Sequence, residues 1–166
     1  MTLDQNGNPQ AQGAGMDTKN LGIIQDQMHH EALAYKKCRV CSEWLSDQTL
    51  KDIANRAAQH HKQHFDSLDN YLRSIAKKEE PRMNSTFNSR PNMSEQEILS
   101  DLLSSEKQLV KEYASDISES SCANLRGLLA NNLVECSADQ LAIFEQMNQR
   151  GFYKTKQAPQ SDITTA

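Results

Sequence analysis

The chain lacks most features that mark membrane, nucleic-acid-binding and secreted proteins. No segment approaches the roughly 18 consecutive apolar residues of a membrane-spanning helix, so no membrane span is expected. Lys and Arg are scattered along a chain whose net charge is −4, so no nucleic-acid partner is expected. The N-terminus has no basic region followed by an apolar run, which predicts synthesis and retention inside a cell.

Aromatic residues are also scarce, at 5% of 166 residues, and apolar residues make up only 37%. Long amphipathic helices tolerate such a composition, because each of them needs only a narrow apolar stripe. The length suits a single domain with a real core. No convincing strand and no Gly-rich phosphate loop can be found.

The four cysteines do not form a recognisable motif. Cys38 and Cys41 are three residues apart in a strongly helical stretch, while Cys122 and Cys136 stand alone. Zinc sites usually pair two cysteine-containing turns, and a thioredoxin-type motif needs a βαβ unit. We therefore expect ordinary free thiols.

Four stretches show helical periodicity, and their ends carry capping signals. Asp17 or Thr18 can begin the first helix, Ser94 with Glu97 forms a capping box for the third, and Gly151 suits a left-handed end of the fourth. Polar tails and a linker with two prolines surround the helices. The expected bundle covers 17–153, with helices at about 17–45, 47–75, 94–118 and 123–150, a disordered tail at 1–16, a linker at 77–93 and a C-terminal tail at 154–166.

A loose internal repeat with a shift of 75 residues organises these helices. It maps Glu31 onto Glu106 and Leu50 onto Leu125. Each copy consists of two periodic stretches separated by a short polar break, as in a helical hairpin. Two such hairpins predict an all-α fold, a four-helix bundle.

The repeat also places ionisable residues in phase with the apolar stripes. Imidazole and carboxylate groups that point inward from facing helices suit iron, manganese or zinc. The candidate ligands are Glu31, His60, His64, Glu106, Glu135 and Asp139.

The usual motif of di-iron and di-manganese bundles is missing, however. Such proteins carry Glu-x-x-His on two helices, but here His61 stands where Glu would precede His64, and Ala138 follows Glu135 by three residues. An altered or degenerate metal site therefore competes with a purely structural polar layer. In that layer the three histidines His60, His61 and His64 would pair with Glu31 or Glu135 and fix the register of the helices.

The first half of the chain contains the entry LGIIQDQMHHEALAYKKC at 21–38 and the segment DIANRAAQHHKQHFDSLDNYL at 52–72. These two segments resemble the first two helices of the Coat F family of bacterial spore coat proteins. Residues 94–159 resemble the Coat F domain nearly end to end, and FEQMNQRGFYKTKQAP at 144–159 is the most specific part. The resemblance covers about residues 20–160.

This resemblance implies a ferritin-like four-helix fold and a place in the protein layers of a bacterial endospore. It implies no catalytic activity and no cofactor, so the first expectation is a non-enzymatic scaffold. Such a scaffold would associate with other spore coat proteins, and its outer faces would also suit a homodimer. The alternative is a ferritin-like di-metal protein with iron or manganese and oxidase, peroxidase or catalase activity, because one fold can carry either role.

Overall fold

A computed structural model describes residues 16–75 and 92–155, and these form four long helices. The helices are α1 (Thr18–Trp44), α2 (Gln48–Ile75), α3 (Glu95–Glu119) and α4 (Ala123–Gln149). The prediction of an all-α four-helix bundle is confirmed, and each helix end lies within one residue of its predicted place. The tail at 1–15, most of the linker and the end of the C-terminal tail lie outside the described residues. None of the described helices is long and apolar enough to cross a membrane.

The capping signals read from the sequence act as expected. Asp17 accepts a hydrogen bond from the backbone N–H of Asn20, and Ser94 forms a complete capping box with Glu97. Gly151 has φ 72°, and the N–H of Phe152 donates to the carbonyl of Met147 at 2.8 Å, which closes the end of α4.

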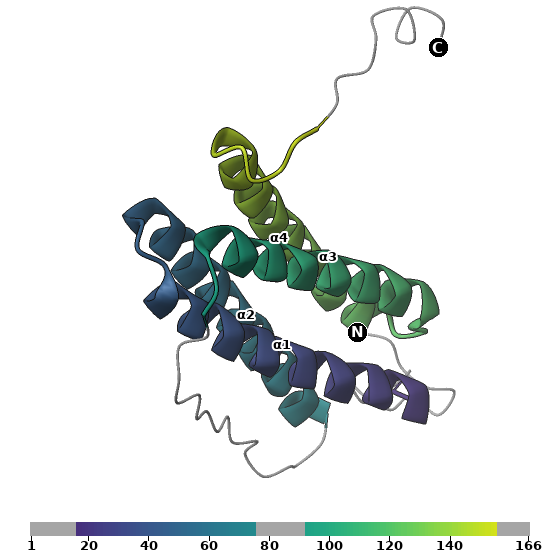
Figure 1. Ribbon diagram of the computed structural model, residues 1–166. Helices are drawn as coiled ribbons and strands as arrows, with labels where there is room; N and C mark the ends of the chain where they lie inside the picture. The colour runs from purple at the N-terminus through teal and green to yellow at the C-terminus, as the bar shows by residue number, and fades with distance from the viewer. Residues whose placement is uncertain (1–15, 76–91, 156–166) are drawn as a thin grey trace, which may run out of the picture.

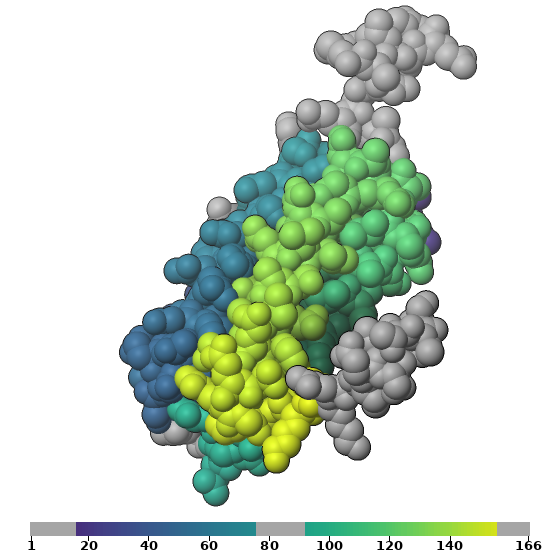
Figure 2. All heavy atoms as spheres, turned by 90° about the horizontal axis from the view of Figure 1, so that it is seen from above, coloured from purple at the N-terminus to yellow at the C-terminus, as the bar shows by residue number. Residues whose placement is uncertain are grey.

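The helices pair as two antiparallel hairpins, α1 with α2 and α3 with α4 (Figure 1). The hairpins meet through α1 against α3 and α2 against α4, and seen from above α4 lies between α2 and α3 (Figure 2). Glu95, at the start of α3, accepts hydrogen bonds from the backbone of Ser46 and Asp47 at the start of α2. Helices α2 and α3 therefore run in the same direction, so the end of α2 and the start of α3 lie at opposite ends of the bundle.

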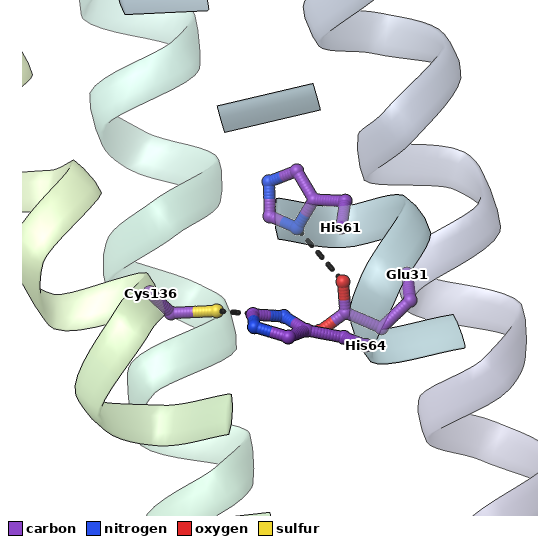
Figure 3. Close-up of side chains that lie close together, drawn as sticks. All are labelled: Glu31, His61, His64 and Cys136. Atoms are coloured by element: carbon purple, nitrogen blue, oxygen red, sulfur yellow. Dashed lines mark hydrogen bonds and ion pairs between the residues drawn. The ribbon is translucent and has the colours of Figure 1, made fainter. Parts of the chain in front are cut away.

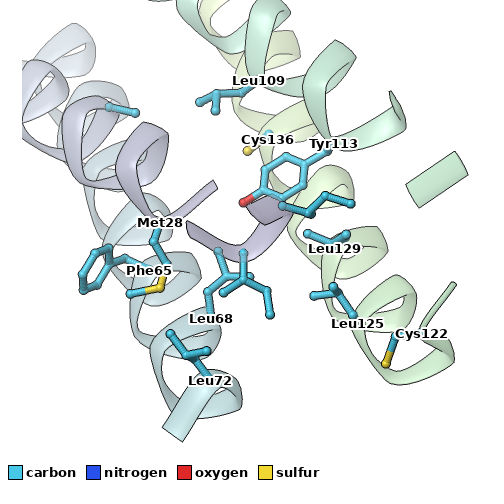
Figure 4. Close-up of a cluster of buried hydrophobic side chains, with 13 residues drawn as sticks. Met28, Phe65, Leu68, Leu72, Leu109, Tyr113, Cys122, Leu125, Leu129 and Cys136 are labelled. Atoms are coloured by element: carbon cyan, nitrogen blue, oxygen red, sulfur yellow. The ribbon is translucent and has the colours of Figure 1, made fainter. Parts of the chain in front are cut away.

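Two apolar clusters fill the bundle, one towards each end. The first lies where α1 and α4 begin and α2 and α3 end (Figure 4), and includes Met28, Leu68, Leu72, Leu125 and Leu129. The second lies at the other end and includes Leu45, Leu50, Leu99, Leu102, Ile143 and Met147. Between the two clusters, halfway along each helix, the core is polar, and this polar layer is the candidate site.

Two glycine substitutions test the cap of α4, with opposite expected signs. Gly151→Ala should lower the free energy of unfolding by about 1 kcal/mol, because alanine is strained at positive φ. Gly127→Ala, at an exposed position inside α4 with nothing near the added Cβ, should raise it by about 0.5–1 kcal/mol. Urea unfolding of both variants measures the difference, and equal signs would contradict the assigned cap.

Candidate functional site

The candidate site is a set of ionisable side chains buried at mid-height of the bundle. Glu31 from α1, His61 and His64 from α2, Glu106 from α3 and Asp139 from α4 are each at most 2% exposed. Charged groups are rarely buried so completely unless they pair with one another or bind an ion. The pairing of these groups therefore decides whether the bundle is stable.

His61 lies between two carboxylates. Its Nδ1 is 2.8 Å from Oε2 of Glu31, and its Nε2 is 2.8 Å from Oε1 of Glu106. An ionised carboxylate can only accept hydrogen bonds, so a ring that donates to both must carry both N–H protons. His61 is then an imidazolium that joins α2 to α1 and to α3.

His64, one turn later on α2, faces the other oxygen of Glu31. Its Nδ1 is 3.2 Å from Oε1 of Glu31 and 3.8 Å from Sγ of Cys136 on α4 (Figure 3). Its Nε2 is 2.8 Å from Oε2 of Glu135, which lies at the rim of the bundle. Through His64 the site reaches from the buried centre to the surface of α4.

Glu31 has a further hydrogen-bond partner on α3. The hydroxyl of Tyr113 donates to its Oε1, and Nδ2 of Asn132 donates to the Tyr113 oxygen at 3.2 Å. Asn132 is itself buried, on the inner face of α4. These contacts hold the Glu31 carboxylate in one orientation.

The pKa values of the three central groups follow from these contacts. Burial alone would raise the pKa of Glu31, but hydrogen bonds and charge from His61 and His64 lower it to about 2. Burial alone would lower the pKa of His61, but hydrogen bonds with Cys38, Glu106 and Glu31 raise it well above 6.5. Burial also opposes protonation of His64, yet its contacts with Glu31 and Glu135 raise its pKa. In the metal-free site these contacts therefore favour the ionised form of Glu31 and the protonated forms of His61 and His64.

The six ligands predicted from the sequence divide into two groups. Glu31, His64 and Glu106 lie in the buried layer, and Glu135 contacts His64 from a position where its side chain is 49% exposed. His60 and Asp139 instead form a separate pair, with Nδ1 of His60 2.6 Å from Oδ2 of Asp139. Arg56 lies 3.5 Å from the same carboxylate, so this pair has its own cation.

Two central residues, His61 and Cys136, were missing from the predicted ligands. A strict alternation of four-residue and three-residue steps would have found both of them. On α2 this spacing runs through Leu50, Ala54, Ala57, His61, His64 and Leu68, and on α4 through Leu125, Leu129, Asn132, Cys136, Asp139 and Ile143. The 75-residue shift maps His61 onto Cys136, so the repeat contained the same signal.

Two overlapping sets of side chains are close enough to share a metal ion. In the first, Glu31, His61, His64 and Cys136 offer four donor atoms that lie within 4.8 Å of one another. In the second, Cys38, His61 and Glu106 offer three. All four cysteines are free and buried, as free thiols were predicted. In addition, Oε2 of Glu106 is buried and has no hydrogen-bond partner.

A scan against models of known protein families matches the second hairpin of the bundle. The family model of the Coat F domain matches residues 94–156. The resemblance to the Coat F family is confirmed. The Coat F match spans α3 and α4, whereas the resemblance of the first two helices lies outside it. No curated protein and no solved structure gives a significant match to the chain.

The buried polar layer extends beyond residues 94–156, the Coat F segment. Glu106, Tyr113 and Cys136 belong to that segment, but Glu31 and both buried histidines come from the preceding hairpin. The site therefore forms only when the Coat F segment packs against α1 and α2.

The charge of Glu31 gives a pH dependence of stability. A pKa lowered from 4.5 to about 2 contributes stability that is present above pH 4.5 and is lost as the pH falls towards 2. In metal-free protein, wild type should exceed Glu31→Gln by about 3 kcal/mol at neutral pH, and this gap should shrink below about pH 4.5. Urea titrations between about pH 7 and about pH 3 measure it. A gap independent of pH would contradict an ionised Glu31.

Removal of His61 should be much more damaging than removal of an exposed histidine. His61→Ala leaves Glu31 and Glu106 buried without their shared cation, so it should lower the free energy of unfolding by about 3–5 kcal/mol. His29→Ala on the exposed side of α1 should change it by less than about 0.5 kcal/mol. Thermal and urea unfolding at neutral pH compare the two, and similar losses would argue against the bridge.

Proposed function

We propose that the protein is a structural component of the bacterial spore coat and acts as a non-enzymatic helical building block. The observation that carries this proposal is the Coat F match over residues 94–156. The match covers the whole second hairpin, including the end of α4 with Arg150, Gly151 and Phe152. The proposed location is accordingly the spore coat, and the proposed partners are other coat proteins or further copies of this chain.

The geometry supports a rigid unit. Helices of 25 to 28 residues are roughly 40 Å long, and apolar clusters hold them together towards both ends. The bridge through His61 fixes α2 against two helices of different hairpins. A block whose helices cannot slide past one another suits a rigid protein layer.

The alternative, a ferritin-like di-metal oxidase, peroxidase or catalase, has less support from the contacts. In such an enzyme, carboxylates from facing helices would hold two iron or manganese ions between them. Here the His61 ring fills the space between Glu31 and Glu106 and contacts both. Both carboxylates are at most 1% exposed.

Fractionation of spores tests the location. In a sporulating host that expresses the full chain, the protein should appear in the detergent extract of the coat, together with known coat proteins. Protein found only in the decoated spore or in the mother-cell lysate would overturn the proposal.

Assays of metal-loaded protein test the absence of catalysis. After loading with iron or manganese and desalting, the protein should consume peroxide and dioxygen no faster than the same amount of free ion. Turnover above that level that is lost in Glu106→Gln and kept in Glu145→Gln, an exposed position on α4, would favour the enzyme instead.

A further inference from the structure

The two buried histidines of α2 both turn their Nδ1 atoms towards the carboxylate of Glu31. Nδ1 of His61 and Nδ1 of His64 face the two oxygens of Glu31, at 2.8 Å and 3.2 Å. Sγ of Cys136 approaches the same Nδ1 of His64 at 3.8 Å (Figure 3). Two nitrogens, one carboxylate and one sulfur from three different helices thus converge on one small volume.

Behind each ring, Nε2 points to another carboxylate. Nε2 of His61 is 2.8 Å from Glu106, and Nε2 of His64 is 2.8 Å from Glu135. Histidine ligands of metal ions commonly donate their remaining N–H to a carboxylate, which fixes the ring orientation and makes the ligating nitrogen more basic. Glu31 has an equivalent support in the hydroxyl of Tyr113.

From this convergence we propose that Glu31, His61, His64 and Cys136 bind a single divalent transition-metal ion of the zinc type. Their four donor atoms already lie within 4.8 Å of one another, and a tetrahedral ion would draw them closer. A dication with one carboxylate, one thiolate and two neutral imidazoles is electrically neutral. On binding, the thiol proton of Cys136 and the Nδ1 protons of His61 and His64 leave to water. His61 keeps its Nε2–H bond to Glu106, and His64 keeps its Nε2–H bond to Glu135.

The donor set also selects the metal. A thiolate with two imidazoles and one carboxylate suits zinc or cobalt, whereas manganese, magnesium and calcium prefer oxygen ligands. This site differs from the di-metal centre predicted from the sequence. Two of the predicted ligands, His60 and Asp139, pair with each other instead, and the proposed ion is a single zinc-type ion rather than two iron or manganese ions. The unpartnered Oε2 of Glu106 lies outside the four proposed ligands and belongs to the second set of donors.

The second set, Cys38 with His61 and Glu106, is the internal competitor. It offers three donors instead of four and uses the opposite edge of the His61 ring. A structural zinc ion is almost always held by four protein ligands, which favours the set that contains Cys136. The two sets place the thiolate on different helices, so cysteine variants distinguish them.

Titration of the metal-free full chain with cobalt(II) chloride tests the proposal. The expected result is saturation at one ion per chain, with a thiolate-to-cobalt charge-transfer band in the near ultraviolet and visible bands typical of four-coordinate cobalt. Stoichiometric zinc chloride should displace the cobalt and raise the melting temperature. No saturable binding, or binding without the thiolate band, would overturn the proposal.

Three cysteine variants identify the sulfur ligand. Cys136→Ser should lose the charge-transfer band, while Cys41→Ser, another buried cysteine outside both sets, should keep it. Cys38→Ser should keep the band as well. If the band were lost in Cys38→Ser and kept in Cys136→Ser, the ion would lie in the competing set and the ligands proposed here would be refuted. Far-ultraviolet circular dichroism shows whether each variant is folded.

The carboxylate behind His64 provides a variant that leaves every direct ligand in place. Glu135→Gln should weaken cobalt binding by about 10- to 100-fold and retain the charge-transfer band. Glu145→Gln, at an exposed position on the same helix, should bind cobalt like wild type. Equal affinities of the two variants would contradict the support assigned to Glu135.

The metal site goes beyond the proposed coat function and does not rest on it. A chain that binds cobalt through Cys136 but is missing from the coat extract would refute the coat role alone. A chain found in the coat extract that fails to bind cobalt would refute the metal site alone.

Discussion

The packing of this bundle depends on one buried ion-paired ring. His61 donates to Glu31 on one side and to Glu106 on the other, so a single side chain of α2 ties together both hairpins. Burial of the two carboxylates would be very costly in free energy without that cation. The attraction between each carboxylate and the His61 imidazolium, at close range in a low-dielectric core, offsets this cost. Because hydrogen bonds need defined distances and angles, this arrangement also fixes the register of the helices in a way that Leu and Ile alone would not.

The polar layer and the apolar clusters have complementary roles. The clusters on either side supply the hydrophobic stabilisation, and they also keep water away from the charges between them. A polar layer of this kind can favour one register over others, which would suit the proposed building block. The same preorganised imidazoles and carboxylates are what a transition-metal ion requires, so a scaffold and a metal site do not exclude each other here.

The Coat F match and the site together show how the two halves depend on each other. The matched segment supplies Glu106, Tyr113 and Cys136, but without α1 and α2 these groups would face no partner. The repeat places Glu31 and Glu106, which flank one ring, at equivalent positions of the two hairpins. It does the same for His61 and Cys136, which lie on the neighbouring helices α2 and α4.

The sequence by itself determined the helices, their caps and the inward phase of Glu31, His64 and Glu106, because periodicity and capping are local properties of the chain. The spacing of apolar residues also favours His61 over His60 and Cys136 over Glu135, although the predicted ligands contained the first of each of these neighbours. Only the tertiary structure decided which side chains His61 and Cys136 meet, since the rotation of each helix about its axis is set by the packing of all four helices together.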